Sequence, residues 1–365
     1  MNRSAPRRST LPVALGSLAL AVIVAACSGA AGSAASATSS PAAQSAAAPV
    51  AQSTAAPAVS ASAAASPAMP SGVRPGTPGG AAAGPAATYS NVAYASTSSS
   101  QVLDIWMPAG VTGPVPLVIF VHGGAFMGGD KSMEGGNVTS VLAAGYAAAS
   151  LNYRLSGEAI FPAAVQDVKA AVRFLRANAA KYGLDPDRFA AWGESAGGNL
   201  VAMIGTTGDQ STVLDDPSLG NAGVSSAVQA VVDFYGPTDF LQMDAQFAAA
   251  PPAACNGQVQ AHDPADSPES AYLGAAIQTV PTQAAAANPI TYIATAKTLP
   301  VFLIAHGDSD CMVPNQQSQI LQQALQAAGA TSTFNLIQGA GHGDQAITTS
   351  QTPVALEMLK SAFGK

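Results

Sequence analysis

One serine in this chain has the surroundings that a catalytic nucleophile needs. Ser195 lies between two glycines in the segment 192–198, which reads WGESAGG. Glycine on both sides lets the backbone turn sharply from a strand into a helix, which exposes the serine oxygen. The flanking residues fit this geometry, because 189–192 read as a short buried strand and 198–204 as a helix. The pattern predicts a nucleophile rather than an incidental serine in a glycine-rich turn.

A serine hydroxyl needs a base to take its proton, and the chain offers 4 histidines. His262 lies in a stretch rich in Pro, Asp and Ser, which predicts an exposed loop. His122 and His306 each end an apolar run, as a satisfied histidine at a strand end does. His342 lies in the Gly-rich loop GAGHG after the expected strand 334–337, late in the chain. These features favour His342 as the base.

A third group must orient the imidazole and stabilise its charged form. Two aspartates compete for this role, Asp308 and Asp310, in the segment HGDSDC that follows the apolar run 301–305. Asp308 has an alternative role as a turn former, because aspartate commonly bonds its own backbone two residues on. Both lie between Ser195 and His342 in the chain, so these residues alone leave the choice open.

A loop of small residues follows another apolar run, 118–121, early in the chain. Its sequence is HGGAF, at 122–126, and its backbone N–H groups can be aimed at a developing negative charge. Ala196 offers a further N–H at the start of the helix after Ser195. We expect glycine in the loop because a side chain would occlude the substrate oxygen. The alternative is an ordinary Gly-rich connection.

Several segments together resemble the α/β-hydrolase esterases, the group that includes feruloyl and acetyl-xylan esterase-like and hormone-sensitive-lipase-like enzymes. They are HGGAF at 122–126, NYRL at 152–155, FPAA at 161–164 with Asp167, GESAGGN at 193–199, SPES at 267–270, and HGDSD at 306–310 with GHG at 341–343. The resemblance covers about residues 88–365. In such enzymes the triad follows the chain order serine, acid, histidine. The resemblance therefore implies Ser195 as nucleophile, Asp310 as acid and His342 as base.

The same resemblance implies an oxyanion hole and a reaction. Backbone N–H groups of Gly124, Ala125 and Ala196 would form the hole, although many relatives have a third glycine where this chain has Ala125. The implied reaction is hydrolysis of a carboxylic ester, of short-chain, acetyl or feruloyl type, through an acyl-serine intermediate without cofactor or metal. An amidase or arylformamidase with the same triad is the alternative. An inactive binding relative would need a broken triad, and none of its parts is missing.

The chain after Ala87 predicts one α/β domain. Strand-like apolar runs alternate with stretches of helical spacing, which predicts an α/β-hydrolase fold, a mostly parallel sheet flanked by helices on both faces. The expected strands are 117–121, 147–151, 189–192, 227–234, 301–305 and 334–337, and the expected helices include 165–175 and 319–328.

The charge and composition of this domain limit the kinds of partner that it is expected to bind. All 21 acidic residues but only 10 of the 14 basic ones follow Ala87, which makes nucleic acid an improbable partner. The expected partner is a small-molecule or polysaccharide-linked ester. Within the domain, about 239–297 are rich in Ala, Pro and Gln without clear periodicity over much of their length. We expect a cap insertion there that selects the substrate, the alternative being a surface connection.

The first residues have the character of an export signal. A basic start precedes an apolar run that ends in VAAC, and the small residues before Cys27 resemble a bacterial lipobox. We expect a lipoprotein-type signal peptide over 1–26, a lipid on Cys27, and anchoring at the outer face of a bacterial membrane. Ordinary cleavage nearby, which leaves the protein secreted, and an uncleaved anchor are the alternatives. Residues 27–87 are nearly all Ala, Ser, Pro, Gly and Thr and predict a disordered tether.

The cysteine count predicts a disulfide. The chain has 3 cysteines, and lipidation of Cys27 leaves Cys255 and Cys311 as an even set. Disulfides persist in the oxidising compartment that an export signal implies. The alternative is two buried free thiols. Because Cys311 directly follows Asp310, a bridge would pin the expected cap insertion to the loop that carries this acid.

Overall fold

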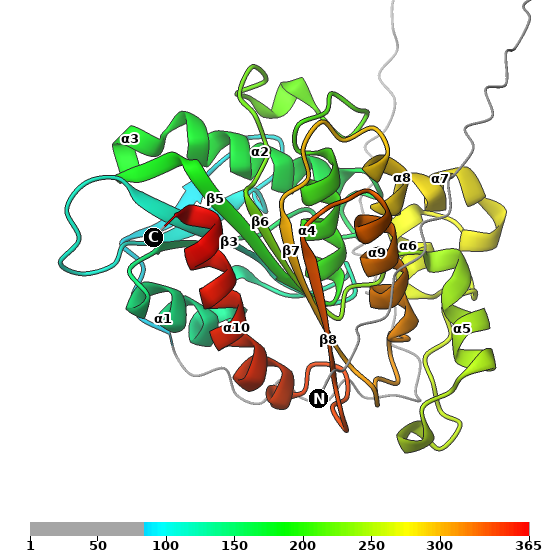
Figure 1. Ribbon diagram of the computed structural model, residues 1–365. Coiled ribbons are helices and arrows are strands. Elements are labelled where there is room, and N and C mark those ends of the chain that lie inside the picture. The colour runs from blue at the N-terminus through cyan, green and yellow to red at the C-terminus, as the bar shows by residue number, and fades with distance from the viewer. Residues whose placement is uncertain (1–83, 365) are drawn as a thin grey trace, which may run out of the picture. The chain divides into compact units, whose positions relative to one another are not determined.

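The computed structural model of the protein describes residues 84–364 (Figure 1). The expected signal segment 1–26, the lipidation site Cys27 and nearly all of the tether 27–87 lie outside these residues and stay predictions. Within the described part, no helix combines the length and the apolar character that crossing a membrane requires.

An eight-stranded sheet forms the centre of the described domain, in the order β1-β2-β4-β3-β5-β6-β7-β8. The strands β4 to β8 run parallel, while β1 and β2 pair antiparallel at one edge. The bounds are β1 Tyr89–Ala93, β2 Val102–Trp106, β3 Val115–Val121, β4 Ala147–Leu151, β5 Leu184–Glu194, β6 Ala230–Phe234, β7 Val301–Gly307 and β8 Ser332–Ile337. The expected mostly parallel sheet is confirmed.

Helices cover both faces of this sheet (Figure 1). Neighbouring residues of a strand point to opposite faces, so Ile119 joins one buried cluster and Phe120 the other. The first cluster includes side chains of α2 Ala163–Ala177, α3 Ala179–Tyr182, α4 Ala196–Thr207 and α9 Gln316–Ala327, and the second those of α1 Gly135–Ala143 and α10 Gln345–Phe363. The strands β3 to β7 are covered on both sides, which is why they contain continuous apolar runs.

All six expected strands are present, and the two strands at the antiparallel edge were not predicted. The first, β1, is largely exposed, so it lacks an apolar run. The second, β2, is interrupted by Asp104, whose carboxylate pairs with the Lys131 ammonium at 2.6 Å. An edge strand with a polar side chain on one face gives too weak a pattern to be recognised from apolar residues alone.

Short helices make up the segment expected as a cap. Figure 1 shows α5 to α8 gathered beside α9 at one end of the domain. Prolines and glycines break the segment so often that no helix in it exceeds 7 residues, and this explains the missing periodicity. The elements are η3 Phe240–Gln242, α5 Met243–Ala249, η4 Ala253–Cys255, α6 Pro268–Leu273, η5 Ile277–Thr279, α7 Pro281–Ala286 and α8 Ile290–Ile293.

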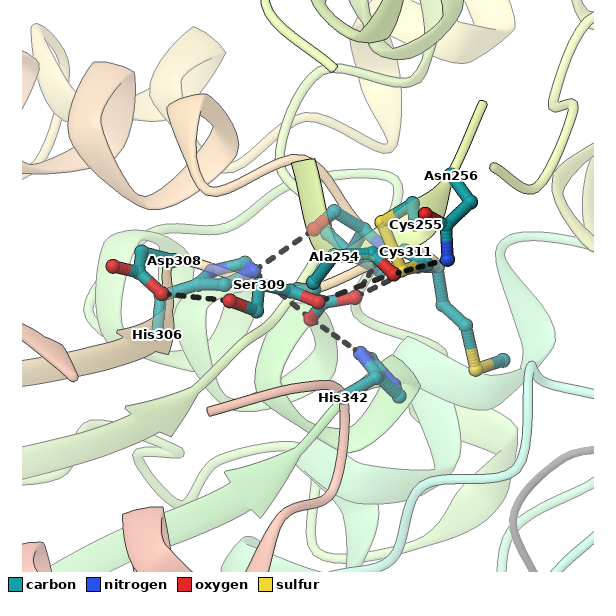
Figure 2. Close-up of a disulfide and its surroundings, with 11 residues drawn as sticks. Ala254, Cys255, Asn256, His306, Asp308, Ser309, Cys311 and His342 are labelled. Carbon is teal, nitrogen blue, oxygen red and sulfur yellow. Dashed lines mark hydrogen bonds and ion pairs between the residues drawn. A yellow bond between two sulfur atoms is a disulfide. The ribbon is translucent and has the colours of Figure 1, made fainter. Parts of the chain in front are cut away.

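A disulfide joins Cys255 to Cys311, as the sequence predicted (Figure 2). Cys255 ends η4, and Cys311 lies in the loop after β7 that also carries Asp310. The backbone N–H of Gln260 adds a second link, because it donates to the Cys311 carbonyl at 2.9 Å. The segment between α5 and α6 is therefore tied covalently and by hydrogen bonding to this loop.

Removal of the disulfide should destabilise the domain. The bond spans a sequence separation of 56 residues, for which the chain-entropy model gives about 4 kcal/mol. In a C27A background, we expect the C255A/C311A variant to lose up to about this free energy of unfolding in a denaturant titration. Thiol counting on the denatured, unreduced C27A protein should find none, whereas two reactive thiols would exclude the bond. Equal stability of oxidised and reduced C27A protein would show that the bond contributes nothing.

Candidate active site

The carboxyl ends of three parallel strands bring together the three residues of the expected triad. Ser195 directly follows β5, Asp310 lies in the loop after β7, and His342 in the loop after β8. The His342 Nδ1 lies 2.7 Å from Asp310 Oδ2, and its Nε2 lies 2.9 Å from Ser195 Oγ. A carboxylate accepts only, so Nδ1–H donates to Asp310 and Nε2 accepts from the Ser195 hydroxyl.

Ser195 occupies a backbone conformation that few residues other than glycine adopt. Its φ is 55° and its ψ is −123°, at the turn between β5 and α4. The turn brings α4 so close to β3 that a Cβ on Gly197 would lie 2.0 Å from the Val121 carbonyl oxygen. The Ser195 N–H donates to the Phe234 carbonyl at 2.9 Å, which ties the turn to β6. Close packing against two strands thus holds the strained serine in place.

The Asp310 carboxylate is fully buried, and four groups hydrogen-bond to it. Oδ1 accepts from the backbone N–H groups of Met312 and Val313 at 2.8 and 2.9 Å, while Oδ2 accepts from His342 and from His306 Nε2 at 3.1 Å. Burial alone would raise the pKa of Asp310, but the positive charge that His342 carries when protonated and the hydrogen bonds of both histidines hold this pKa well below its usual range. The site thus keeps a buried negative charge against the imidazole.

Asp308 points elsewhere. Its Oδ1 accepts from the Ser309 hydroxyl at 2.9 Å and from the Gly339 backbone N–H at 2.7 Å. Asp308 does not bond its own backbone two residues on, as a turn former would. It is Asp310 Oδ1 that accepts from the backbone N–H groups two and three residues further on, those of Met312 and Val313. Asp308 links the loop after β7 to the loop after β8, so it stabilises the geometry without contacting His342.

The other histidines have structural partners. His306 is the last residue but one of β7, near the strand end as expected, and its Nδ1 lies 2.8 Å from the Ser318 hydroxyl. His122 is buried, stacks on the Tyr153 ring at 4.5 Å and hydrogen-bonds to the Gly123 carbonyl, and burial lowers its pKa. The prediction of an exposed loop at His262 is wrong for this side chain, which is 0% exposed. The polar composition of the loop suggested exposure, but the loop folds back between α5 and α6, where His262 contacts Asp244 and Glu269.

The loop after β3 presents backbone N–H groups near Ser195. Ala125 and Phe126 have φ of 56° and 59°, and the Gly124 carbonyl accepts from the N–H groups of Met127 and Gly128 at 3.0 Å each. Within residues 84–364, the N–H groups of Gly124, Ala125 and Ala196 donate to no protein group. Ala125 and Ala196 also line the pocket that contains Ser195, whereas Gly124 does not.

The structure gives a reason for glycine in this loop that the sequence did not predict. A Cβ on Gly124, whose φ is 111°, would lie 2.3 Å from the Gly128 carbonyl oxygen, and a Cβ on Gly123 would lie 2.8 Å from the Glu194 carbonyl oxygen. A side chain would thus meet the protein's own backbone before any substrate. Glycine is needed to close the turn and to let it pack on the Ser195 segment.

A solvent-open pocket of about 280 Å³ lies over Ser195 and His342. Its wall is mostly apolar, with two further polar side chains that come from the segment expected as a cap. The lining residues are Ala125, Phe126, Ser195, Ala196, Pro237, Gln260, Glu269, Met312, Val313 and His342. No group of three or more His, Cys, Asp or Glu side chains that could hold a metal ion occurs within 84–364.

Tyr235 and Glu194 link His342 to the serine turn, and no role was predicted for either residue from the sequence. The Tyr235 ring lies edge-on to the His342 ring, with centroids 4.7 Å apart, and its hydroxyl donates to Glu194 Oε2 at 2.7 Å. Glu194 immediately precedes Ser195, so the contact links the serine turn to the histidine. The signal for this contact in the sequence is the acidic residue inside GESAGG, which lies at the end of an expected strand, where a partly buried polar group needs partners.

A second carboxyl group lies against Glu194. The amide nitrogen of Asn137 donates to Glu134 Oε2 at 3.0 Å and to Glu194 Oε1 at 3.1 Å. Burial, together with the negative charge of Glu194, raises the pKa of Glu134 to about 8. Glu134 therefore keeps its proton at neutral pH.

Comparisons with known proteins agree with this geometry. Residues 103–325 match the family model BD-FAE. Esterase LipC of Mycobacterium tuberculosis is 32% identical over 264 residues, which cover 69% of this chain and 59% of LipC. The chain thus spans less than two thirds of this relative.

Solved structures show the same fold. A truncated carbohydrate esterase from gut microbiota is 35% identical with a TM-score of 0.66, covering 76% of this chain and 96% of that one. Esterase 2 of Thermogutta terrifontis is 22% identical with a TM-score of 0.61, covering 76% and 95%, and supports the fold alone. The sheet order, the strained serine turn and these matches together show that the chain belongs to the BD-FAE family, an esterase family with the α/β-hydrolase fold.

Proposed function

We propose that this protein hydrolyses carboxylic esters through an acyl-serine intermediate, with Ser195 as nucleophile, His342 as base and Asp310 as the acid that orients it. The observation that carries the proposal is the continuous chain of hydrogen bonds from Asp310 through His342 to Ser195. Each contact has the length and the direction that proton transfer to His342 requires.

The proposed reaction has two steps. His342 Nε2 takes the Ser195 proton as Oγ attacks the ester carbonyl, and the imidazolium that forms is stabilised by the Asp310 carboxylate. The tetrahedral intermediate collapses when His342 donates this proton to the leaving alcohol. Water then attacks the acyl-serine as His342 takes its proton, and His342 returns this proton to Ser195 Oγ when the acyl–oxygen bond breaks and the acid leaves.

The oxyanion of both steps would bind to backbone N–H groups. Those of Ala125 and Ala196 line the pocket and donate to no described protein group, which leaves them available to a substrate oxygen. Loss of one such donor typically costs roughly 2.7–4 kcal/mol of transition-state stabilisation. Because the donors are backbone groups held by two packed turns, they need no rearrangement when charge develops.

Pocket size and relatives favour a short acyl group. The pocket over Ser195 is small, because its space amounts to about 280 Å³ even when its open mouth is included. The similar gut protein is described as a carbohydrate esterase. We infer that acetyl and other short-chain esters suit this chain best, with the segment 239–297 forming the side of the pocket that meets the substrate.

Replacement of the nucleophile tests the proposal directly. S195A should abolish covalent labelling by an organophosphonate and lower kcat/KM for p-nitrophenyl acetate by roughly four orders of magnitude or more. The fold should persist, which circular dichroism and the melting temperature would check. Labelling of S195A at the wild-type rate would contradict the assignment.

The two aspartates of the loop after β7 provide a matched pair. D310N removes the charge that stabilises the imidazolium and favours the wrong tautomer, so kcat should fall roughly 10³–10⁴-fold. D308N keeps an oxygen that accepts from Gly339 and should lower kcat less than about tenfold. Steady-state kinetics of both variants would reveal a reversed order, which would exchange the two roles.

Glu134 should make stability depend on pH. Its pKa is about 8 in the folded protein against an ordinary value of 4.5, so between these values the folded state holds a proton that the unfolded chain releases. This group therefore lowers the free energy of unfolding as pH rises from about 4.5 to about 8. E134Q removes the effect, and its stability relative to wild type should increase by about 1 kcal/mol or more between pH 5 and pH 9. Parallel stability curves in denaturant titrations would contradict this.

A further inference from the structure

Glu269 is a buried carboxylate whose two oxygens have different surroundings. Its side chain is on α6, the residue is 4% exposed, and it lines the pocket with Ser195 and His342. Oε2 accepts from His262 Nδ1–H at 2.9 Å. Oε1 accepts from no group among residues 84–364, and it is not sealed off from solvent either. One half of a buried carboxylate therefore faces the pocket without a protein partner.

Contacts on both sides fix the position of this carboxylate. Behind it, the backbone N–H of His262 donates to Asp244 Oδ1 at 2.8 Å, which ties the loop to α5. On α6, the Tyr272 ring stacks on the Phe126 ring with centroids 3.9 Å apart. Phe126 belongs to the loop that carries the expected oxyanion donors, so α6 and Glu269 are held directly against the reaction centre.

The apolar surroundings of Glu269 make its burial unfavourable for the stability of the fold. The pocket wall is otherwise largely apolar, with Phe126, Pro237, Met312 and Val313. A buried charge destabilises a fold unless its hydrogen-bonding capacity is met, and packing alone would be served better by an apolar side chain. A few placed polar groups in an apolar pocket are what orients a ligand. Oε1 can thus accept a hydrogen bond from a molecule bound in the pocket.

A neutral donor suits this position better than a cation. Burial alone would lower the pKa of His262, but the hydrogen bond and charge of Glu269, with the charge of Asp244, raise it, so a positive charge on His262 is favoured beside this carboxylate. His342 becomes positive during the proposed reaction in the same pocket. A cationic substrate group would meet that charge, whereas a hydroxyl donates to Oε1 without repulsion.

We propose that Glu269 Oε1 binds a hydroxyl group carried by the substrate close to the scissile ester, and that the enzyme thereby selects hydroxylated esters. This inference rests on the proposed esterase function. The hydroxyl can belong to the alcohol or to the acyl part of the ester, and the two sources are separated by the choice of substrate.

Two pairs of small esters test the proposal on the full chain. On the alcohol side, 2-hydroxyethyl acetate is compared with 2-methoxyethyl acetate, and on the acyl side, ethyl glycolate with ethyl methoxyacetate. Each methoxy ester keeps the shape but loses the donor. p-Nitrophenyl acetate, which has no hydroxyl, reports on the triad alone.

Glu269→Gln replaces the charged acceptor with a neutral amide of the same shape. We expect kcat/KM for the hydroxylated member of one pair to fall about tenfold or more, with its methoxy partner and p-nitrophenyl acetate unchanged within about twofold. Asp266→Asn is the matched control, because Asp266 is an exposed acid in the same loop. It should change none of the five rates.

Each contrary result has a distinct meaning. If E269Q lowers all five rates together, Glu269 acts on the fold or the chemistry and the proposal is wrong. If it changes none, or if wild type does not prefer either hydroxylated ester, the proposal is also wrong. Failure of wild type on p-nitrophenyl acetate and all four other esters would instead contradict the proposed esterase function.

Discussion

The geometry of the site depends on the compensation of one buried negative charge, the carboxylate of Asp310. A fully buried negative charge is tolerated only when hydrogen bonds and an opposite charge compensate it. Here two backbone N–H groups, His306 and His342 supply them. The loop after β7 must therefore hold one shape, and the disulfide at Cys311, with the link from Asp308 to the loop after β8, keeps it there. Figure 2 shows this loop with the disulfide on one side and His342 on the other.

A second constraint acts on the serine side. The positive φ of Ser195 persists because α4, β3 and β6 pack tightly around the turn. Glu194, placed next to it by the same turn, is half-buried and contacts Tyr235 and Asn137, and Asn137 also contacts the buried Glu134. The Tyr235 ring in turn contacts the His342 ring. These contacts form one polar network that supports both Ser195 and His342. A motif centred on the serine does not reveal this network, because most of its members lie far from Ser195 in the sequence.

Much of the fold was predictable because the central strands are buried on both faces and the nucleophile turn has a local signature. The same approach failed for β1 and β2, whose exposed or interrupted patterns carry little apolar signal. It also failed for His262 and left Glu269 without a role, because both depend on contacts between residues of a loop and short helices that have no periodicity. The choice between Asp308 and Asp310 needed resemblance to a family, since it depends on which carboxylate the tertiary structure turns toward His342.

The measurement that tests this account most directly is a crystal structure of the protein after reaction with an organophosphonate. The account predicts phosphorus on Ser195 Oγ, with the phosphoryl oxygen about 2.7–3.1 Å from the backbone nitrogens of Ala125 and Ala196. His342 should keep its contact with Asp310. A phosphoryl oxygen turned away from both amides, or an adduct on another serine, would contradict the account.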